Sequence, residues 1–233
     1  MRIHVIQHVP FEGPAAIADW AAFHGYSVSS THLFVTSAKL PSLDSFDILV
    51  VMGGPMGVHD TAEFAWLQAE IDFVRNALDA SKFVLGVCLG AQIMAHALGG
   101  QVTQNPEREI GWFPLRFAKQ SSIPWLASLG SELTAFHWHG ETFSLPTGAL
   151  AIAESDACKN QGFLWKGHGL ALQFHLETTS ASAEALLVNC GADLQKTGAY
   201  VQSADQIRAG AKVHSVALNR TLMRILDSWL PKG

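Results

Sequence analysis

The heptapeptide Gly86-Val87-Cys88-Leu89-Gly90-Ala91-Gln92 constrains the fold most, because it places a lone cysteine between a strand-like and a helix-like segment. Residues 82–85 indicate a short buried strand, and residues 93–98 indicate a helix that ends at Gly99-Gly100. At such a junction a thiol can project above the carboxyl end of a sheet, with glycines on both sides relieving the crowding of a tight turn. The helix N-terminus then favours the thiolate. The alternative is a small hydrophobe packed in a core, but the flanking glycines and the following helix favour a nucleophile.

Strand and helix patterns alternate through the first hundred residues, which predicts an α/β fold with right-handed crossovers and a mostly parallel sheet. The predicted strands are 2–6, a strand within 26–35, 47–52 and 82–85, and the predicted helices are 13–23, 63–78 and 93–98. Further on, the pattern predicts a few short strands at 111–118, 150–153 and 162–165, a buried strand at 169–175, and helices at 182–196 and 204–229 with a break near Gly210.

Composition favours one domain spanning residues 1–233 and excludes several classes of protein. Hydrophobic residues make up 48% and charged residues 15%, which is enough for a large core and too apolar for a disordered chain. A net charge of -5 without a Lys/Arg cluster argues against a nucleic-acid partner. Three cysteines without a CxxC pair suit a reducing compartment. With no signal peptide or membrane span in the pattern, we expect a cytoplasmic protein without a membrane partner.

The nucleophile needs a base, and His175 is well placed to serve as one. His175 and Glu177 lie two residues apart at the end of an extended run, so their side chains project to the same side and the carboxylate can orient the imidazole. Ligand sites of parallel sheets lie outside the carboxyl ends of the strands, where Cys88 and His175 could meet. The alternative for His175 is a histidine with a structural role only.

The chain has 11 histidines, and His137-Trp138-His139 has the spacing of a metal-binding pair. No third ligand stands at a recognisable spacing from this pair, so we expect no metal site.

A third element is the turn Met52-Gly53-Gly54-Pro55-Met56-Gly57 after the predicted strand 47–52. The amides of Gly54 and Leu89 could form a two-donor oxyanion hole above the sheet. The alternative is an ordinary turn between strand and helix. A phosphate-binding loop is excluded, because the Walker lysine and the GxGxxG spacing are missing.

These motifs resemble those of the class I glutamine amidotransferase domain, with its Cys-His-Glu triad. The resemblance covers most of the chain and is carried by Gly86–Gln92, Gly53-Gly54-Pro55 and Gln173-Phe174-His175-Leu176-Glu177. The segments His8–Pro14 and Gln161-Gly162-Phe163 are similar to the stand-alone GMP-synthase-like branch. One departure is Leu176, where the family usually has proline; its side chain should point away from the triad.

The resemblance implies a flavodoxin-like fold, no cofactor, and hydrolysis of the glutamine side-chain amide to release ammonia. Cys88 would form a γ-glutamyl thioester, His175 would transfer protons, and Glu177 would orient His175. Gln92 resembles the residue that binds the α-amino acid end of glutamine, and backbone groups of Trp138, His139, Gly140 and Glu141 would complete that pocket. Two Gly-containing segments, 55–60 and 138–143, are expected to overhang Cys88 as loops that gate the site.

Two other functions stay open. The same thioester chemistry would serve a γ-glutamyl peptidase acting on γ-glutamyl peptides or conjugates, since only the leaving group differs. A non-catalytic binding or regulatory protein of the same fold is a further interpretation, which the intact triad disfavours. If ammonia is transferred, we expect its acceptor to be supplied in trans by a separate synthase or acceptor protein.

Overall fold

The computed structural model describes residues 1–119 and 123–231. Within this part, nine strands form one sheet in the order β2-β1-β3-β4-β9-β8-β7-β5-β6. The strands are β1 (Arg2–Gln7), β2 (Ser27–His32), β3 (Ile48–Val51), β4 (Phe83–Val87), β5 (Val102–Phe117), β6 (Glu132–Phe143), β7 (Ala149–Glu154), β8 (Gly162–Trp165) and β9 (Gly169–Leu172). The helices are α1 (Ala16–Phe23), α2 (Leu67–Asp79), α3 (Leu89–Ala97), α4 (Pro124–Ala127), α5 (Ser180–Cys190) and α6 (Ala204–Trp229), with short 3-10 turns at Leu43–Ser45 and Gly191–Gln195.

The α/β, flavodoxin-like prediction is confirmed by the half of the sheet that contains β4. The strands β2, β1, β3, β4 and β9 pair in parallel. All residues of β3 and four of the five residues of β4 are buried, as expected of parallel strands covered on both faces. The strands with the strongest apolar signal, β3 and β4, therefore lie inside the parallel half of the sheet.

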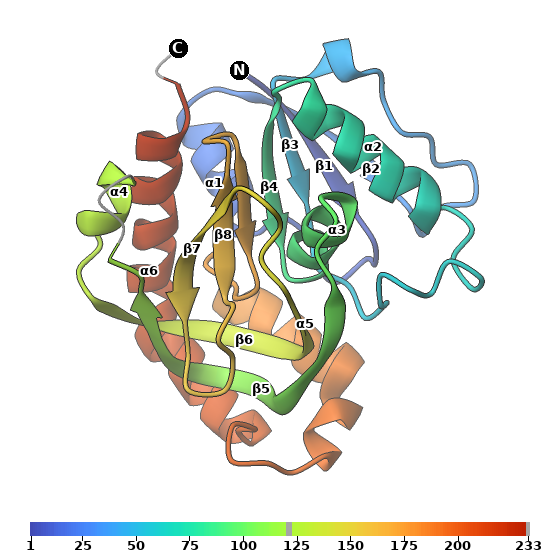
Figure 1. Cartoon of the computed structure of the whole chain (residues 1–233). Helices are drawn as coiled ribbons and strands as arrows, with labels where there is room; N and C mark the ends of the chain where they lie inside the picture. Colours follow the sequence, from blue (N-terminus) through green and yellow to red (C-terminus); the bar gives the residue numbers. More distant parts are fainter. Residues whose placement is uncertain (120–122, 232–233) are drawn as a thin grey trace.

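The other half of the sheet is antiparallel and larger than predicted. The pairs β9–β8, β8–β7, β7–β5 and β5–β6 are all antiparallel. Strands β5 and β6 have 16 and 12 residues and run across the lower part of the molecule in Figure 1. The prediction of only short extra strands was wrong here, and β6 was missed because His137, His139 and Glu141 interrupt its apolar pattern.

Helices cover both faces of the sheet (Figure 1). One core lies under α2 and α3, and the other lies under α1, α5 and α6. Helix α2 buries Leu67, Ile71, Val74 and Leu78, the spacing of one helix face. It begins at Leu67 rather than at residue 63, and α1 begins at Ala16 rather than at residue 13. None of the described helices is long and apolar enough to cross a membrane.

Helix α6 continues through Gly210, where the sequence predicted a break. A Cβ atom at Gly210 would collide with the indole of Trp112, whose Nε1 donates to the Ile207 carbonyl at 3.0 Å. The glycine therefore allows close packing of β5 against the helix. A helix tolerates one such glycine at a cost of about 1 kcal/mol relative to alanine, which tertiary contacts can offset.

Candidate active site

Cys88 lies on the sharp turn between β4 and α3. It is the N-cap of α3 with φ 53° and ψ −107°, and its amide donates to the Leu172 carbonyl at 2.8 Å. A positive φ is strained for a residue with a side chain, and such strain is typical of nucleophile turns. The turn is tight because a Cβ at Gly90 would overlap the Val51 carbonyl. The structure thus has the strand–turn–helix junction that the sequence predicted.

His175 and Glu177 form a buried pair just beyond β9. His175 Nδ1 lies 2.7 Å from Glu177 Oε1, and the backbone amide of His175 donates to the Phe136 carbonyl at 2.8 Å. Burial alone would lower the pKa of His175, but Glu177 and the Cys88 thiol raise it well above its ordinary value. Its Nε2 is buried and has no hydrogen-bond partner among the described residues. Because Nδ1 is held by Glu177, Nε2 is the nitrogen available for proton transfer.

Gln173 is a site residue that the sequence prediction did not assign. Its Nε2 lies 3.7 Å from Cys88 Sγ, and its Oε1 accepts from Gln92 Nε2 at 3.1 Å. Cys88 Sγ is also 3.6 Å from the Trp138 carbonyl. The sequence contained a signal for this assignment, because Gln173, His175 and Glu177 are spaced by two residues and their side chains would project to the same side of an extended chain. Gln173 therefore links the nucleophile to Gln92.

The backbone amides of Gly54 and Leu89 lie on facing turns, with a Leu89 methyl only 3.1 Å from where a Cβ of Gly54 would stand. Neither amide donates to another backbone or side-chain group in residues 1–119 and 123–231. The carbonyl of Gly53 contacts His8 Nδ1 at 2.9 Å. In a trans peptide the N–H points opposite to the carbonyl of the preceding residue, so this contact directs the Gly54 amide away from His8.

His8 is itself held by a buried carboxylate. Its Nε2 lies 2.9 Å from Glu70 Oε1, and both side chains are fully buried. Burial alone would lower the pKa of His8, but Glu70 and the Gly53 carbonyl raise it. Both contacts are to acceptors, so the doubly protonated ring satisfies both at once.

Cys88 opens into a cavity of about 390 Å³. Four of the five predicted substrate-binding residues line it: Gln92, Trp138, Gly140 and Glu141. Gly54, Pro55, Met56, Gly57 and Asp60 form another wall. The segment 138–143 belongs to β6 and is paired with β5, so the prediction that it is a gating loop was wrong.

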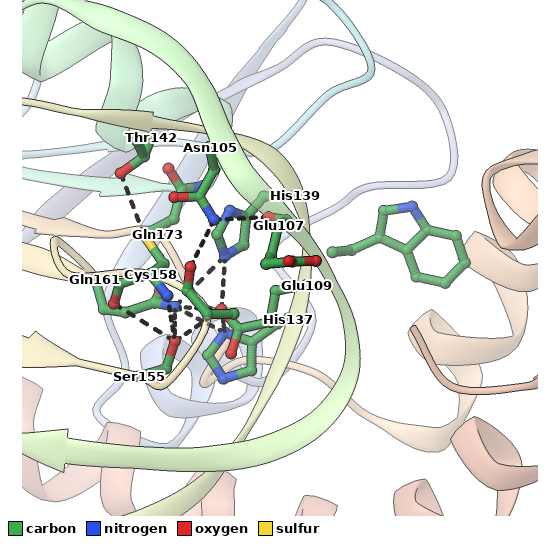
Figure 2. A network of polar contacts seen from close by, with 12 residues as sticks. Asn105, Glu107, Glu109, His137, His139, Thr142, Ser155, Cys158, Gln161 and Gln173 are labelled. Carbon is green, nitrogen blue, oxygen red and sulfur yellow. Dashed lines mark hydrogen bonds and ion pairs between the residues drawn. The ribbon is translucent and has the colours of Figure 1, made fainter. Parts of the chain in front are cut away.

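His139 does not line the cavity, in contrast to the prediction. Along β6 its side chain points with that of His137 to the side opposite Trp138, into the network that Figure 2 shows. There Glu109 Oε2 lies 3.2 Å from His139 Nε2 and 3.4 Å from His137 Nδ1. Glu109 is thus a third group of the kind and spacing that could hold a metal, one that the sequence did not reveal because it comes from another strand.

Glu109 already receives other hydrogen bonds in this network. Gln161 Nε2 donates to Glu109 Oε2 at 2.6 Å and Ser155 Oγ donates at 3.0 Å. Burial lowers the pKa of His137 to about 4, so its imidazole is neutral near pH 7. We interpret the cluster as a hydrogen-bond network that joins β5 and β6 to Ser155 and Gln161, at the two ends of the connection between β7 and β8.

Several other lining residues were not predicted as part of the site: Glu12, Gln104, Arg108, Leu186, Cys190 and Asp193. Arg108 forms an ion pair with Asp193 at 3.3 Å, and Asp193 also accepts from Trp138 Nε1 at 3.2 Å. Glu12 stands in the quoted segment 8–14, but nothing in its pattern indicates that the loop folds over Cys88. Glu12 comes from a loop, Gln104 and Arg108 from β5, Leu186 and Cys190 from α5, and Asp193 from the 3-10 turn after α5, so the fold alone brings them to one cavity.

Comparisons with known proteins agree with one another. The profile of the family described as Glutamine amidotransferase class-I matches residues 23–193. The chain is 33% identical to the glutamine amidotransferase-like protein YfeJ of Salmonella typhimurium, over 97% of this chain and 96% of YfeJ. It is 31% identical to a glutamine-hydrolyzing GMP synthase subunit of Sulfurisphaera tokodaii, over 58% of this chain and 69% of that protein. Among solved structures, a glutamine amidotransferase from Thermotoga maritima superimposes with a TM-score of 0.90 at 25% identity, covering 100% of this chain and 99% of the other.

Proposed function

Because this chain belongs to the class I glutamine amidotransferase family, we propose that it hydrolyses the side-chain amide of glutamine through a cysteinyl γ-glutamyl thioester. The observation that supports this best is the arrangement of three buried groups. Cys88 stands on a strained turn facing a cavity, and His175 lies beside it, held by Glu177 at 2.7 Å. A nucleophile, a base and a group that orients the base are the parts that acyl transfer requires.

In the proposed first step, Cys88 Sγ attacks the amide carbon of glutamine, and the charge that develops on oxygen is stabilised by the amides of Gly54 and Leu89. As the C–N bond breaks, His175 gives its proton to the nitrogen, which leaves as ammonia. In the second step, His175 takes a proton from water as the water oxygen attacks the thioester. The C–S bond then breaks, glutamate is released, and the Cys88 thiolate is left beside the protonated His175, which restores the starting pair.

Substrate orientation is assigned to polar side chains that line the cavity. Gln92 is held by Gln173 at 3.1 Å, and Glu141 by Gln104 at 3.0 Å, so both side chains are fixed before substrate arrives. Such polar groups can pair with the α-ammonium and α-carboxylate of glutamine, which would be costly to bury unpaired.

A glutamine-mimicking electrophile, 6-diazo-5-oxonorleucine, tests this assignment. We expect it to modify Cys88 and to abolish ammonia release from glutamine. Cys190 lines the same cavity, but burial and the nearby Glu12 and Asp193 raise its pKa to about 11, so it is a protonated thiol at neutral pH. Modification of Cys190 or Cys158 with loss of activity, while Cys88 stays free, would overturn the assignment.

A second candidate function is γ-glutamyl peptidase. The cavity of about 390 Å³ at Cys88 is also lined by Leu186, Cys190 and Asp193, and its volume offers room for a leaving group larger than ammonia. Steady-state kinetics with glutamine and a panel of γ-glutamyl peptides at equal concentration separate the two functions. A peptide preferred by about tenfold, roughly 1.4 kcal/mol in the transition state, would support the peptidase instead.

A partner that uses the ammonia is a further part of the proposal, because one relative is named as a GMP synthase subunit. In that case the isolated chain should be a poor glutaminase, and the segment 55–60, which forms one wall of the cavity, is the element that a partner would reposition. The test is the glutaminase rate of the pure protein with and without a candidate synthase. A high rate that no partner changes would contradict coupling.

A further inference from the structure

Glu12 brings a second carboxylate to the catalytic centre. It lies on the loop between β1 and α1 and lines both the main cavity and a small cavity next to His175 and Glu177. A Cβ at Gly53 would collide with Glu12 Oε2 and would stand 3.5 Å from both Cys88 Cβ and His175 Cε1. The carboxylate, the nucleophile and the base therefore converge on one point above Gly53.

The Glu12 side chain is half-buried, and in the described part of the chain no side chain or amide forms a hydrogen bond or ion pair with it. Burial raises its pKa, although His175 and His8 act in the opposite direction. A partly desolvated carboxylate gains free energy from a partner of opposite charge. Since Glu12 lines the cavity, a cation bound there could be that partner.

The cavity that contains Cys88 has a polar lining. Gln92 is held by Gln173 and Glu141 by Gln104, and both are assigned above to the γ-glutamyl part of the substrate. Arg108 is the cation of the lining, and Asp193 pairs with it at 3.3 Å. Glu12 is the lining carboxylate that lies beside both Cys88 and His175.

The part of the site beside His175 receives the leaving group if the proposed function holds. When the C–N bond breaks, His175 gives its proton to the departing nitrogen, so that nitrogen must lie next to His175. Glu12 lies next to His175 as well. The nitrogen and whatever is attached to it thus face Glu12.

We propose that Glu12 forms an anionic leaving-group subsite, which favours γ-glutamyl amides that release ammonia or a cationic amine over γ-glutamyl peptides, whose leaving amine carries a carboxylate. The proposal rests on the proposed function and narrows its substrate class. Ammonia or an amine that has left takes up a proton from solvent and can pair with Glu12 as an ammonium ion. A leaving group with its own carboxylate meets a like charge in a poorly solvated place, where repulsion is strong.

Two substrates of nearly equal size and opposite leaving-group charge test the proposal. γ-Glutamylethylenediamine releases an amine with a second, cationic nitrogen, and γ-glutamylglycine releases an amine with a carboxylate. We expect the wild-type protein to prefer the cationic compound by about tenfold or more in kcat/KM. Glu12→Gln should reduce this ratio by about tenfold, and Glu12→Asp, which keeps the charge, should retain most of it.

Glu63→Gln is the matched control, because it removes one exposed carboxylate that does not line the cavity and should leave the ratio unchanged. If Glu12→Gln slows both substrates equally, Glu12 acts on His175 and the subsite is refuted. A wild-type protein that hydrolyses both compounds equally well also refutes it, and leaves the glutaminase function intact. Failure to hydrolyse glutamine and every γ-glutamyl compound would refute the function itself, and the subsite with it.

Discussion

The contact between His8 and the Gly53 carbonyl predicts the effect of position 8 on the proposed oxyanion hole of Gly54 and Leu89. His8 Nδ1 lies 2.9 Å from this carbonyl and fixes the peptide that carries the Gly54 amide. Without the contact, that peptide can rotate and the amide no longer points at the developing charge. Loss of one oxyanion donor typically lowers kcat by about 10²–10³, or roughly 3–4 kcal/mol. We expect kcat to fall by this factor when the residue at position 8 cannot donate a hydrogen bond to the Gly53 carbonyl.

Two double variants separate the loss of the His8–Gly53 contact from the cost of leaving the Glu70 carboxylate buried without its partner. His8→Asn/Glu70→Gln keeps a donor close to the place of Nδ1, whereas His8→Leu/Glu70→Gln removes it, and both remove the same carboxylate. The asparagine variant should keep most of the glutaminase rate. The leucine variant should lose about a hundredfold in kcat.

The rate of alkylation by iodoacetamide distinguishes loss of the oxyanion hole from a general structural defect, because a structural defect would slow both alkylation and turnover. This reaction displaces iodide at a CH₂ group and forms no oxyanion, so its rate reports the thiol and its base alone. We expect the two double variants to react with iodoacetamide within about threefold of each other, while their kcat values differ by about 10². Equal kcat values in the two variants, or a parallel fall in alkylation, would refute the orienting role of His8.

Four further predictions concern the triad and the network behind it. His175→Ala should lower kcat by about a hundredfold or more, and a harmless His175→Ala beside an inactive His137→Ala would contradict the triad. Cys88→Ser should abolish ammonia release yet leave the thermal unfolding midpoint within a few degrees, whereas retained activity would exclude Cys88 as the nucleophile. Glu177 raises the pKa of His175, so Glu177→Gln should move the alkaline limb of the kcat/KM profile to lower pH; a limb that stays in place would show that Glu177 does not act through His175. Burial lowers the pKa of His137 to about 4 from 6.5, so between these values the unfolded chain binds a proton that the native protein does not. The free energy of unfolding should therefore fall by roughly 3 kcal/mol as pH drops from 7 to 4, and in urea titrations His137→Gln should lack this part of the pH dependence.

The sequence predicted the parallel half of the fold because its signals are local. The strands around Leu49 and Leu85 are short apolar runs, and the Cys88 turn is marked by glycines on both sides. His175 and Glu177 were found because they lie two residues apart in the short extended segment after β9. These parts follow from rules that operate within a few residues.

The missed parts depend on contacts between distant segments. Strand β6 carries the polar residues His137, His139 and Glu141, whose partners Glu109 and Gln104 lie on β5, so its pairing depends on a distant segment and no strand was predicted. His139 was placed in the pocket on the basis of resemblance, but the partner that draws it away, Glu109, comes from β5. Glu12 reaches the site only because the loop after β1 folds back over Gly53.

The amide of Cys88 donates to Leu172, and this pairing of β4 with β9 has a kinetic consequence. Strands β5, β6, β7 and β8 lie between β4 and β9 in the sequence. The turn at Cys88 can therefore form with β4 and α3 before His175, which follows β9, is brought next to Cys88. Contacts between segments so distant in sequence close late, because the entropy of a long loop must be overcome first. Ammonia release during refolding should therefore recover with the slowest phase, after the strand signal in circular dichroism. A chain in which β9 has not yet paired with β4 lacks His175 beside Cys88, and we expect it to hydrolyse no glutamine.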